Sequence, residues 1–159
     1  MDLIQRLITR WADHGIAIRS GAPSDALDDF ETRHRLKLPS DFRAYLAAVD
    51  GMGEDGTCDE DMFCFFQLAD LRTIADLVPD RVSSFPDAQR FVIFADHSIS
   101  LPSFAIRLTA NATDATPVAS VFTDGGALGV QEFFDSFTDF LQSYLDGPIE
   151  TSVLLPSSD

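Results

Sequence analysis

The chain has 159 residues, 45% of them hydrophobic and 14 of them phenylalanine, so one domain can bury a packed core without a metal or a disulfide scaffold. Eleven basic against 26 acidic residues give a net charge of −15, which repels nucleic-acid phosphates and anionic lipid and attracts basic proteins. No apolar run has signal-peptide or membrane-span length, so we expect a soluble, cytoplasmic protein.

The negative charge is unevenly distributed along the chain. Seven basic and seven acidic residues balance over residues 1–43, so the whole excess lies in residues 44–159. Such a field suits association with a basic protein partner. The alternative is that the charge serves only solubility.

Three helices are predicted in the N-terminal third. The first is marked by an apolar stripe at helical spacing: Leu3, Ile4, Leu7, Ile8 and Trp11. It should end near His14 and Gly15, where glycine suits the left-handed exit. Ser24 or Asp25 is expected to cap a second helix, and Pro39 to open a third that ends at Gly51.

The remainder of the chain reads as strands followed by one helix. Apolar runs or alternation predict strands at 62–66, 91–94, 104–108, 118–122 and 127–131, with a helical turn near 71–75. A last helix should begin near Asp135. This order predicts an α+β fold with N-terminal helices, a largely antiparallel central sheet and a C-terminal helix packed on it. Residues 1–150 would form one domain, with 151–159 a loose tail.

Residues 51–61 form a glycine-rich acidic segment, called the acidic loop below. It is either a solvated loop or a partner-facing patch, whose carboxylates would be Glu54, Asp55, Asp59, Glu60 and Asp61. An EF-hand is disfavoured because, counted from Asp50, Met52 stands at position 3 and Asp55 at the glycine position. A looser, adventitious divalent site is a further alternative, and we expect no cofactor.

Nothing in the sequence assembles a catalytic set. Cys58 and Cys64 lack zinc-ribbon spacing, and Cys64 fits a small core residue of its strand. Asp96-His97-Ser98 places three catalytic residue types together, but neighbouring residues point in different directions and cannot converge as a triad. These observations favour a binding module over an enzyme, with no catalytic, cofactor or metal residues.

Two motifs carry a resemblance to a known family. The first comprises Phe30-Glu31, Leu38-Pro39, Asp41-Phe42-Arg43 and Asp50-Gly51, and the second runs from Phe133 to Leu141. Over roughly residues 24–147 the chain resembles the SUKH superfamily, which includes yeast Smi/Knr-type cell-wall regulators and bacterial immunity proteins. Asp50 replaces the more usual Asn, and the acidic insertion is a departure.

The resemblance implies a non-enzymatic protein that binds another protein. One form would be an immunity protein that occupies the active or substrate-binding surface of a cognate toxin, and the charge suits a basic nuclease-type toxin domain. The alternative is a regulatory or scaffold module of the Smi/Knr type. The motif residues themselves are expected to be structural, with Glu31 pairing with Arg43 or a nearby N–H.

Overall fold

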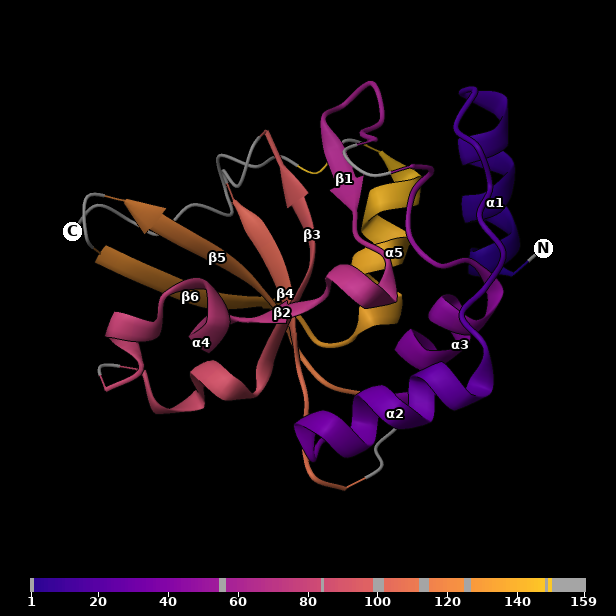
Figure 1. Ribbon diagram of the computed structural model, residues 1–159. Helices are drawn as coiled ribbons and strands as arrows, with labels where there is room; N and C mark the ends of the chain where they lie inside the picture. The colour runs from indigo at the N-terminus through magenta and orange to yellow at the C-terminus, as the bar shows by residue number, and fades with distance from the viewer. Residues whose placement is uncertain are drawn as a thin grey trace.

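A computed structural model describes residues 2–54, 57–83, 85–98, 102–111, 115–124, 127–147 and 149 (Figure 1). The helices are α1 (Leu3–Asp13), α2 (Ser24–His34), α3 (Ser40–Ala48), α4 (Ile74–Leu77) and α5 (Phe137–Asp146), with 3₁₀ turns at Leu68–Asp70, Pro79–Arg81 and Pro86–Gln89. The strands are β1 (Phe63–Phe65), β2 (Arg72–Thr73), β3 (Phe91–His97), β4 (Ser103–Arg107), β5 (Val118–Asp124) and β6 (Ala127–Phe134). In the described part of the chain, no helix is long and apolar enough to cross a membrane.

The strands form one six-stranded antiparallel sheet. Its order is β1-β3-β4-β5-β6, and the short β2 also pairs with β3. Each long strand pairs with the one that follows it in the chain, as short connections favour. The expected α+β fold, with helices before and after an antiparallel sheet, is confirmed.

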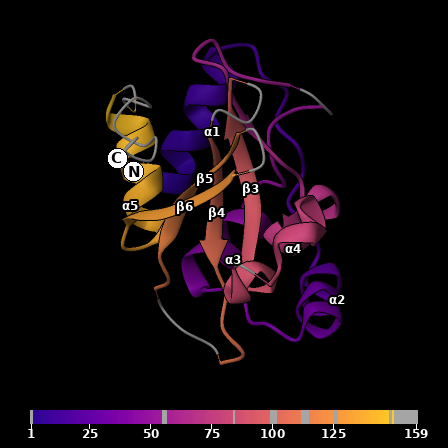
Figure 2. The ribbon, with the colours of Figure 1, turned by 90° about the vertical axis from the view of Figure 1, so that its left-hand side faces the viewer.

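Alternate residues of β3 divide the core between the two faces of the sheet. Val92 and Phe94 point into the larger core under α1, α3 and α5, whereas Phe91 and Ile93 point into a smaller core that includes Ile74 of α4. Figure 2 shows α5 on one side of the sheet and α4 on the other. All five side chains are 3% exposed or less, so both faces of β3 are closed to water.

Several boundaries differ from the predictions. α3 ends at Ala48 rather than at Gly51, because Val49 turns extended and buries its side chain completely. β6 continues through Phe133 to Phe134, beyond the predicted strand end at residue 131. Ser136, not Asp135, caps α5, its hydroxyl accepting from the Asp139 backbone N–H at 3.0 Å. The predicted tail, 151–159, lies outside the described residues.

Candidate functional site

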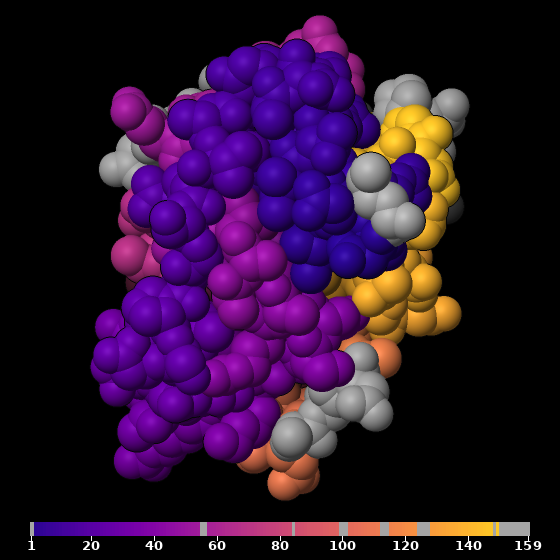
Figure 3. All heavy atoms as spheres, turned by 90° about the vertical axis from the view of Figure 1, so that its right-hand side faces the viewer, coloured from indigo at the N-terminus to yellow at the C-terminus, as the bar shows by residue number. Residues whose placement is uncertain are grey.

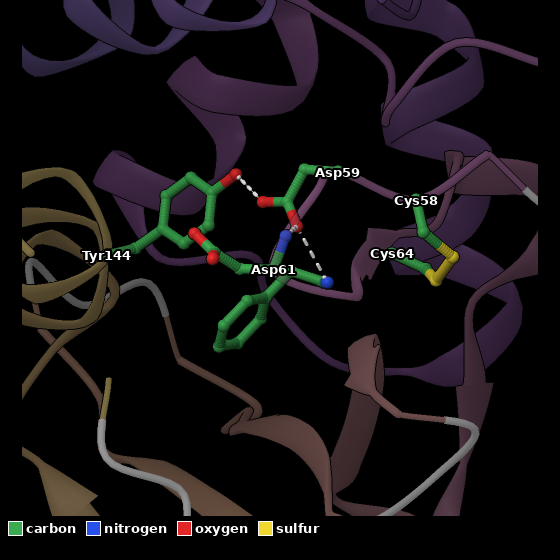
Figure 4. Close-up of a disulfide and its surroundings, with 6 residues drawn as sticks. Cys58, Asp59, Asp61, Cys64 and Tyr144 are labelled. Carbon is green, nitrogen blue, oxygen red and sulfur yellow. Dashed lines mark hydrogen bonds between the residues drawn. A yellow bond between two sulfur atoms is a disulfide. The ribbon is translucent and has the colours of Figure 1, made fainter. Parts of the chain in front are cut away.

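The acidic loop connects α3 to β1 and lies against α1 and the end of α5 (Figures 1 and 4). Gly51 and Gly53 adopt positive φ angles of 77° and 53°, which start the loop with turns that other residues rarely make. Met52 forms an isolated β-bridge with Ile18, which lies in the segment after α1. It also donates its N–H to the Phe65 carbonyl at 3.0 Å. The start of the loop is therefore attached both to the segment after α1 and to β1.

Asp59 occupies the interior of the loop, in contrast to the surface position expected for it. Its side chain is 7% exposed and accepts hydrogen bonds from the backbone N–H groups of Asp61 and Phe63, each at 2.9 Å. The other carboxylate oxygen accepts from the hydroxyl of Tyr144 (Figure 4). Buried N–H and O–H groups need acceptors, and one carboxylate supplies three. Asp59 therefore holds the loop together and leaves little of its side chain on the surface.

Tyr144 connects this carboxylate to the helices. Its hydroxyl also accepts from the indole N–H of Trp11 at 3.1 Å, and the guanidinium of Arg10 lies 4.5 Å from the centre of its ring. Burial, followed by the hydrogen bond to Asp59, raises the pKa of Tyr144. The hydroxyl therefore stays protonated and remains a donor to Asp59.

Glu60 and Asp61 remain on the surface and pair with α1. The Glu60 carboxylate lies 2.8 Å from Nδ1 of His14, and that of Asp61 lies 3.3 Å from Nη2 of Arg10. Their side chains are nevertheless 70% and 47% exposed. Both carboxylates therefore have a defined position and still face solvent.

Glu54 is exposed at the start of the loop, and Asp55 lies outside the described residues. The backbone carbonyl of Glu54 accepts from the N–H of Thr57 at 2.9 Å. Of the five carboxylates predicted to face a partner, the structure therefore places three on the described surface: Glu54, Glu60 and Asp61.

The two cysteines form a disulfide, which corrects the interpretation of Cys64 as a separate core residue. In β1 the flanking residues Phe63 and Phe65 are buried, so the alternation of the strand turns Cys64 to the other face, where it is half-buried and meets Cys58. Aromatic residues on both sides of Cys64 were the sequence signal for this orientation. The bond closes the part of the loop that contains Asp59, Glu60 and Asp61.

The remaining polar candidates, Glu31 and Asp50, make hydrogen bonds that stabilise the fold. Glu31 accepts from Nη1 of Arg43 at 2.9 Å and from the Leu38 N–H at 2.8 Å, which confirms both of its expected pairings. Asp50 accepts from the Leu68 N–H at 2.6 Å, a role that the sequence did not reveal. These carboxylates are occupied within the protein and are not free contact groups.

No constellation for catalysis or metal binding emerges from the residues described. No group of three or more His, Cys, Asp or Glu side chains within that part of the chain is placed to hold a metal ion. In the Asp96-His97-Ser98 segment, the two strand residues Asp96 and His97 point to opposite faces of β3, and the His97 ring lies 4.6 Å from that of Phe63.

Most of the chain matches the model of a known family. The model of the SMI1 / KNR4 family (SUKH-1) matches residues 21–143. No curated protein gives a significant match. The matched range includes the acidic loop, whereas α1 precedes it and Tyr144 follows it. The contacts that brace the loop through Arg10, Trp11, His14 and Tyr144 therefore come from outside the matched residues.

Proposed function

The chain belongs to the SMI1/KNR4 family (SUKH-1), and from this membership we propose that it is a non-enzymatic binding domain that acts as an immunity protein against a basic toxin domain. The observation that carries the proposal is the position of Glu54, Glu60 and Asp61. Three exposed carboxylates lie on a loop that a buried hydrogen-bond network through Asp59 holds in place.

Electrostatics explains why such a loop suits a nuclease-type toxin. A nuclease surface carries cations that bind phosphates, and fixed carboxylates can replace these phosphates without being cleaved. The net charge of −15 accelerates encounter with a basic partner, and a braced loop loses little conformational entropy on binding. The toxin would be blocked because its substrate surface is covered.

The proposed compartment is the cytoplasm, where the toxin would act. Thiol-reducing systems keep most cytosolic cysteines reduced, so the Cys58–Cys64 bond is expected to open there. Asp59 then becomes the principal restraint on the loop, because its hydrogen bonds to Phe63 and Tyr144 do not depend on the disulfide.

The test is charge reversal at the three exposed carboxylates. A variant carrying Glu54→Lys, Glu60→Lys and Asp61→Lys is mixed with the toxin domain that the purified chain retains, and association is followed by stopped-flow fluorescence at low and high salt. We expect association to slow at least about tenfold at low salt, with a smaller difference at high salt.

A matched control separates the loop from net charge. Asp29→Lys, Asp80→Lys and Asp135→Lys make the same change in charge at exposed carboxylates elsewhere on the protein. This control should associate much faster than the loop variant. Equal rates for the two variants would show that the loop is not the contact.

The family description also supports a regulatory or scaffold module as a second candidate. The exposed carboxylates would then serve several partners weakly rather than one tightly. Identification by mass spectrometry of the proteins retained on the purified chain distinguishes the two, because an immunity protein retains one toxin at high salt and a scaffold retains a changing set.

A further inference from the structure

A groove of about 430 Å³ lies between α1, α3 and α5, remote from the carboxylates of the acidic loop. These three helices meet on the face shown in Figure 3. The apolar side chains that line the groove are contributed by all three helices: Leu3, Ile4, Ile8, Ala44, Ala48, Phe137 and Leu141.

The groove is apolar because the hydrophobic stripe of α1 is wide and the core covers only part of it. Leu7 and Trp11 are buried, whereas Ile4 and Ile8 on the flank of the stripe are only half-buried. On the opposite wall, α3 presents exposed alanines whose short side chains do not cover these isoleucines. The result is an apolar surface open to solvent.

Hydrogen bonds fix the positions of the walls. The Asp41 carboxylate at the start of α3 accepts from the backbone N–H and the hydroxyl of Thr138 at the start of α5, each at 2.9 Å. Asp2 caps α1 by accepting from the Gln5 N–H at 2.8 Å. Both carboxylates stand at the groove, and the described residues that line it include no Lys, Arg or His.

We propose that this groove receives the apolar face of a basic amphipathic segment of a protein partner. Its volume accommodates one or two large apolar side chains, and the three helical walls suit the helix-in-groove mode of recognition. Lysine or arginine residues beside the apolar anchors would meet Asp2 and Asp41 at the rim. The proposal does not depend on the role of the acidic loop.

Charge complementarity identifies the partner as basic. A second copy of the chain would bring another −15 to the same face, and an acidic segment would meet only carboxylates at the rim. A larger groove, of about 610 Å³ beside α2, shows the contrast. It is lined by Asp29 and Asp50 together with Arg33, so its charges give no such preference.

The experiment uses a synthetic helical peptide with leucines on one face and lysines on the other, added to isotopically labelled protein. We expect amide chemical-shift changes to concentrate on α1, α3 and α5. Two comparison peptides replace every lysine by glutamate or every leucine by serine. Both should bind at least about tenfold more weakly, because one lacks the charge and the other lacks the anchors.

Variants of α3 provide a matched pair. Ala48→Trp fills the groove, whereas Ala47→Trp places the same side chain at an exposed neighbouring position that does not line it. Ala48→Trp should weaken binding of the leucine–lysine peptide at least about tenfold, whereas Ala47→Trp should leave its affinity unchanged. Ala44→Trp provides a second groove-filling variant if Ala48→Trp fails to fold by circular dichroism.

A further variant isolates the charge at the rim of the groove. Asp2→Asn keeps the cap of α1, since asparagine caps as well as aspartate. It should weaken binding of the leucine–lysine peptide but not of the peptide in which glutamate replaces lysine. The proposal is overturned if Ala48→Trp binds the peptide as tightly as Ala47→Trp, or if the serine–lysine peptide binds equally well. Self-association that Ala48→Trp abolishes would assign the groove to a second copy and would also overturn it.

Discussion

The hydroxyl of Tyr144 in the last turn of α5 donates a hydrogen bond to the buried carboxylate of Asp59, 85 residues earlier in the chain. This bond joins the C-terminal helix to the acidic loop and gives one acid of that loop a structural role. The neighbouring Glu60 and Asp61 instead face solvent. The carboxylates of the loop therefore divide into one that shapes it and others that a partner can reach.

Removal of the Asp59 carboxylate should destabilise the protein. Asp59→Ala leaves the N–H groups of Phe63 and Asp61 and the hydroxyl of Tyr144 without their acceptor, which should lower the free energy of unfolding by about 2–3 kcal/mol. Urea denaturation measures the change. Asp61→Ala, which removes an exposed ion pair, should stay within about 1 kcal/mol of the parent. Equal losses in the two variants would contradict the structural role of Asp59.

The chain's two tyrosines should resist ionisation until the protein unfolds. Burial raises the pKa of Tyr45 and of Tyr144, whereas both ionise near pH 10 in the unfolded chain. Above about pH 10 the unfolded state then binds fewer protons than the folded state. The contribution of the two tyrosines to the free energy of unfolding is therefore fully present below about pH 10 and is lost as the pH rises further. Tyrosinate absorbance should appear together with the loss of circular dichroism. Absorbance that rises near pH 10 in folded protein would show that the hydroxyls are accessible.

Reduction of the Cys58–Cys64 bond should lower stability without releasing the loop. A disulfide that closes so short a loop contributes about 2 kcal/mol through the unfolded state. The Phe63 N–H still donates to Asp59 after reduction, so its amide should keep its protection from hydrogen exchange. Cys58→Ser with Cys64→Ser is the comparison that needs no reductant. Full exchange of the Phe63 amide in that variant would show that the disulfide alone orders the loop.

Local patterns were enough to predict the main helices and the long strands of the fold. The apolar spacing of α1, Pro39 before α3 and the alternation in β4 each depend on neighbouring residues, and each prediction was confirmed near its expected position. Phe133 and Phe134 fell between the strand predicted at 127–131 and the helix expected near Asp135, because aromatic residues fit either structure. Pairing with β5 decided their conformation, and that pairing is not visible in a local window.

The site was predicted less completely because its chemistry depends on distant residues. Composition revealed an acidic loop, but only the fold shows that Tyr144 turns Asp59 inward. Likewise, Asp41 reads as an ordinary residue of a first helical turn until α5 brings Thr138 to it. Glu31 was easier to predict, since Leu38 and Arg43 lie close to it in sequence.

Glu31 should contribute more to stability than the other acid that pairs with Arg43. Its side chain is 11% exposed and bonds both Arg43 and the Leu38 N–H, so Glu31→Ala leaves two partly buried donors unpaired. We expect a loss of about 2–3 kcal/mol by urea denaturation. Asp28 pairs with the same guanidinium but is 64% exposed, and Asp28→Ala should cost less than about 1 kcal/mol. A reversal of this order would contradict the structural assignment of Glu31.

Gly51 and Gly15 form a matched pair because both have a φ of 77°. A side chain at Gly15 would meet nothing within 4 Å, whereas a Cβ at Gly51 would lie 2.6 Å from the Gln67 nitrogen and 2.7 Å from the Phe66 carbonyl carbon. Gly15→Ala should therefore cost about 1–2 kcal/mol for the left-handed conformation alone. Gly51→Ala carries the same cost and must also displace backbone, which adds about 1–3 kcal/mol.

Urea denaturation of the two glycine variants measures this difference directly. Because the conformational cost is common to both, the excess for Gly51→Ala reports the close approach between the start of the acidic loop and the chain that follows β1. Equal losses would mean that the two segments separate readily, and the loop would then lack a fixed base. A clear excess would mean that Gly51 is required because the backbone that follows β1 leaves no room for a Cβ at this position.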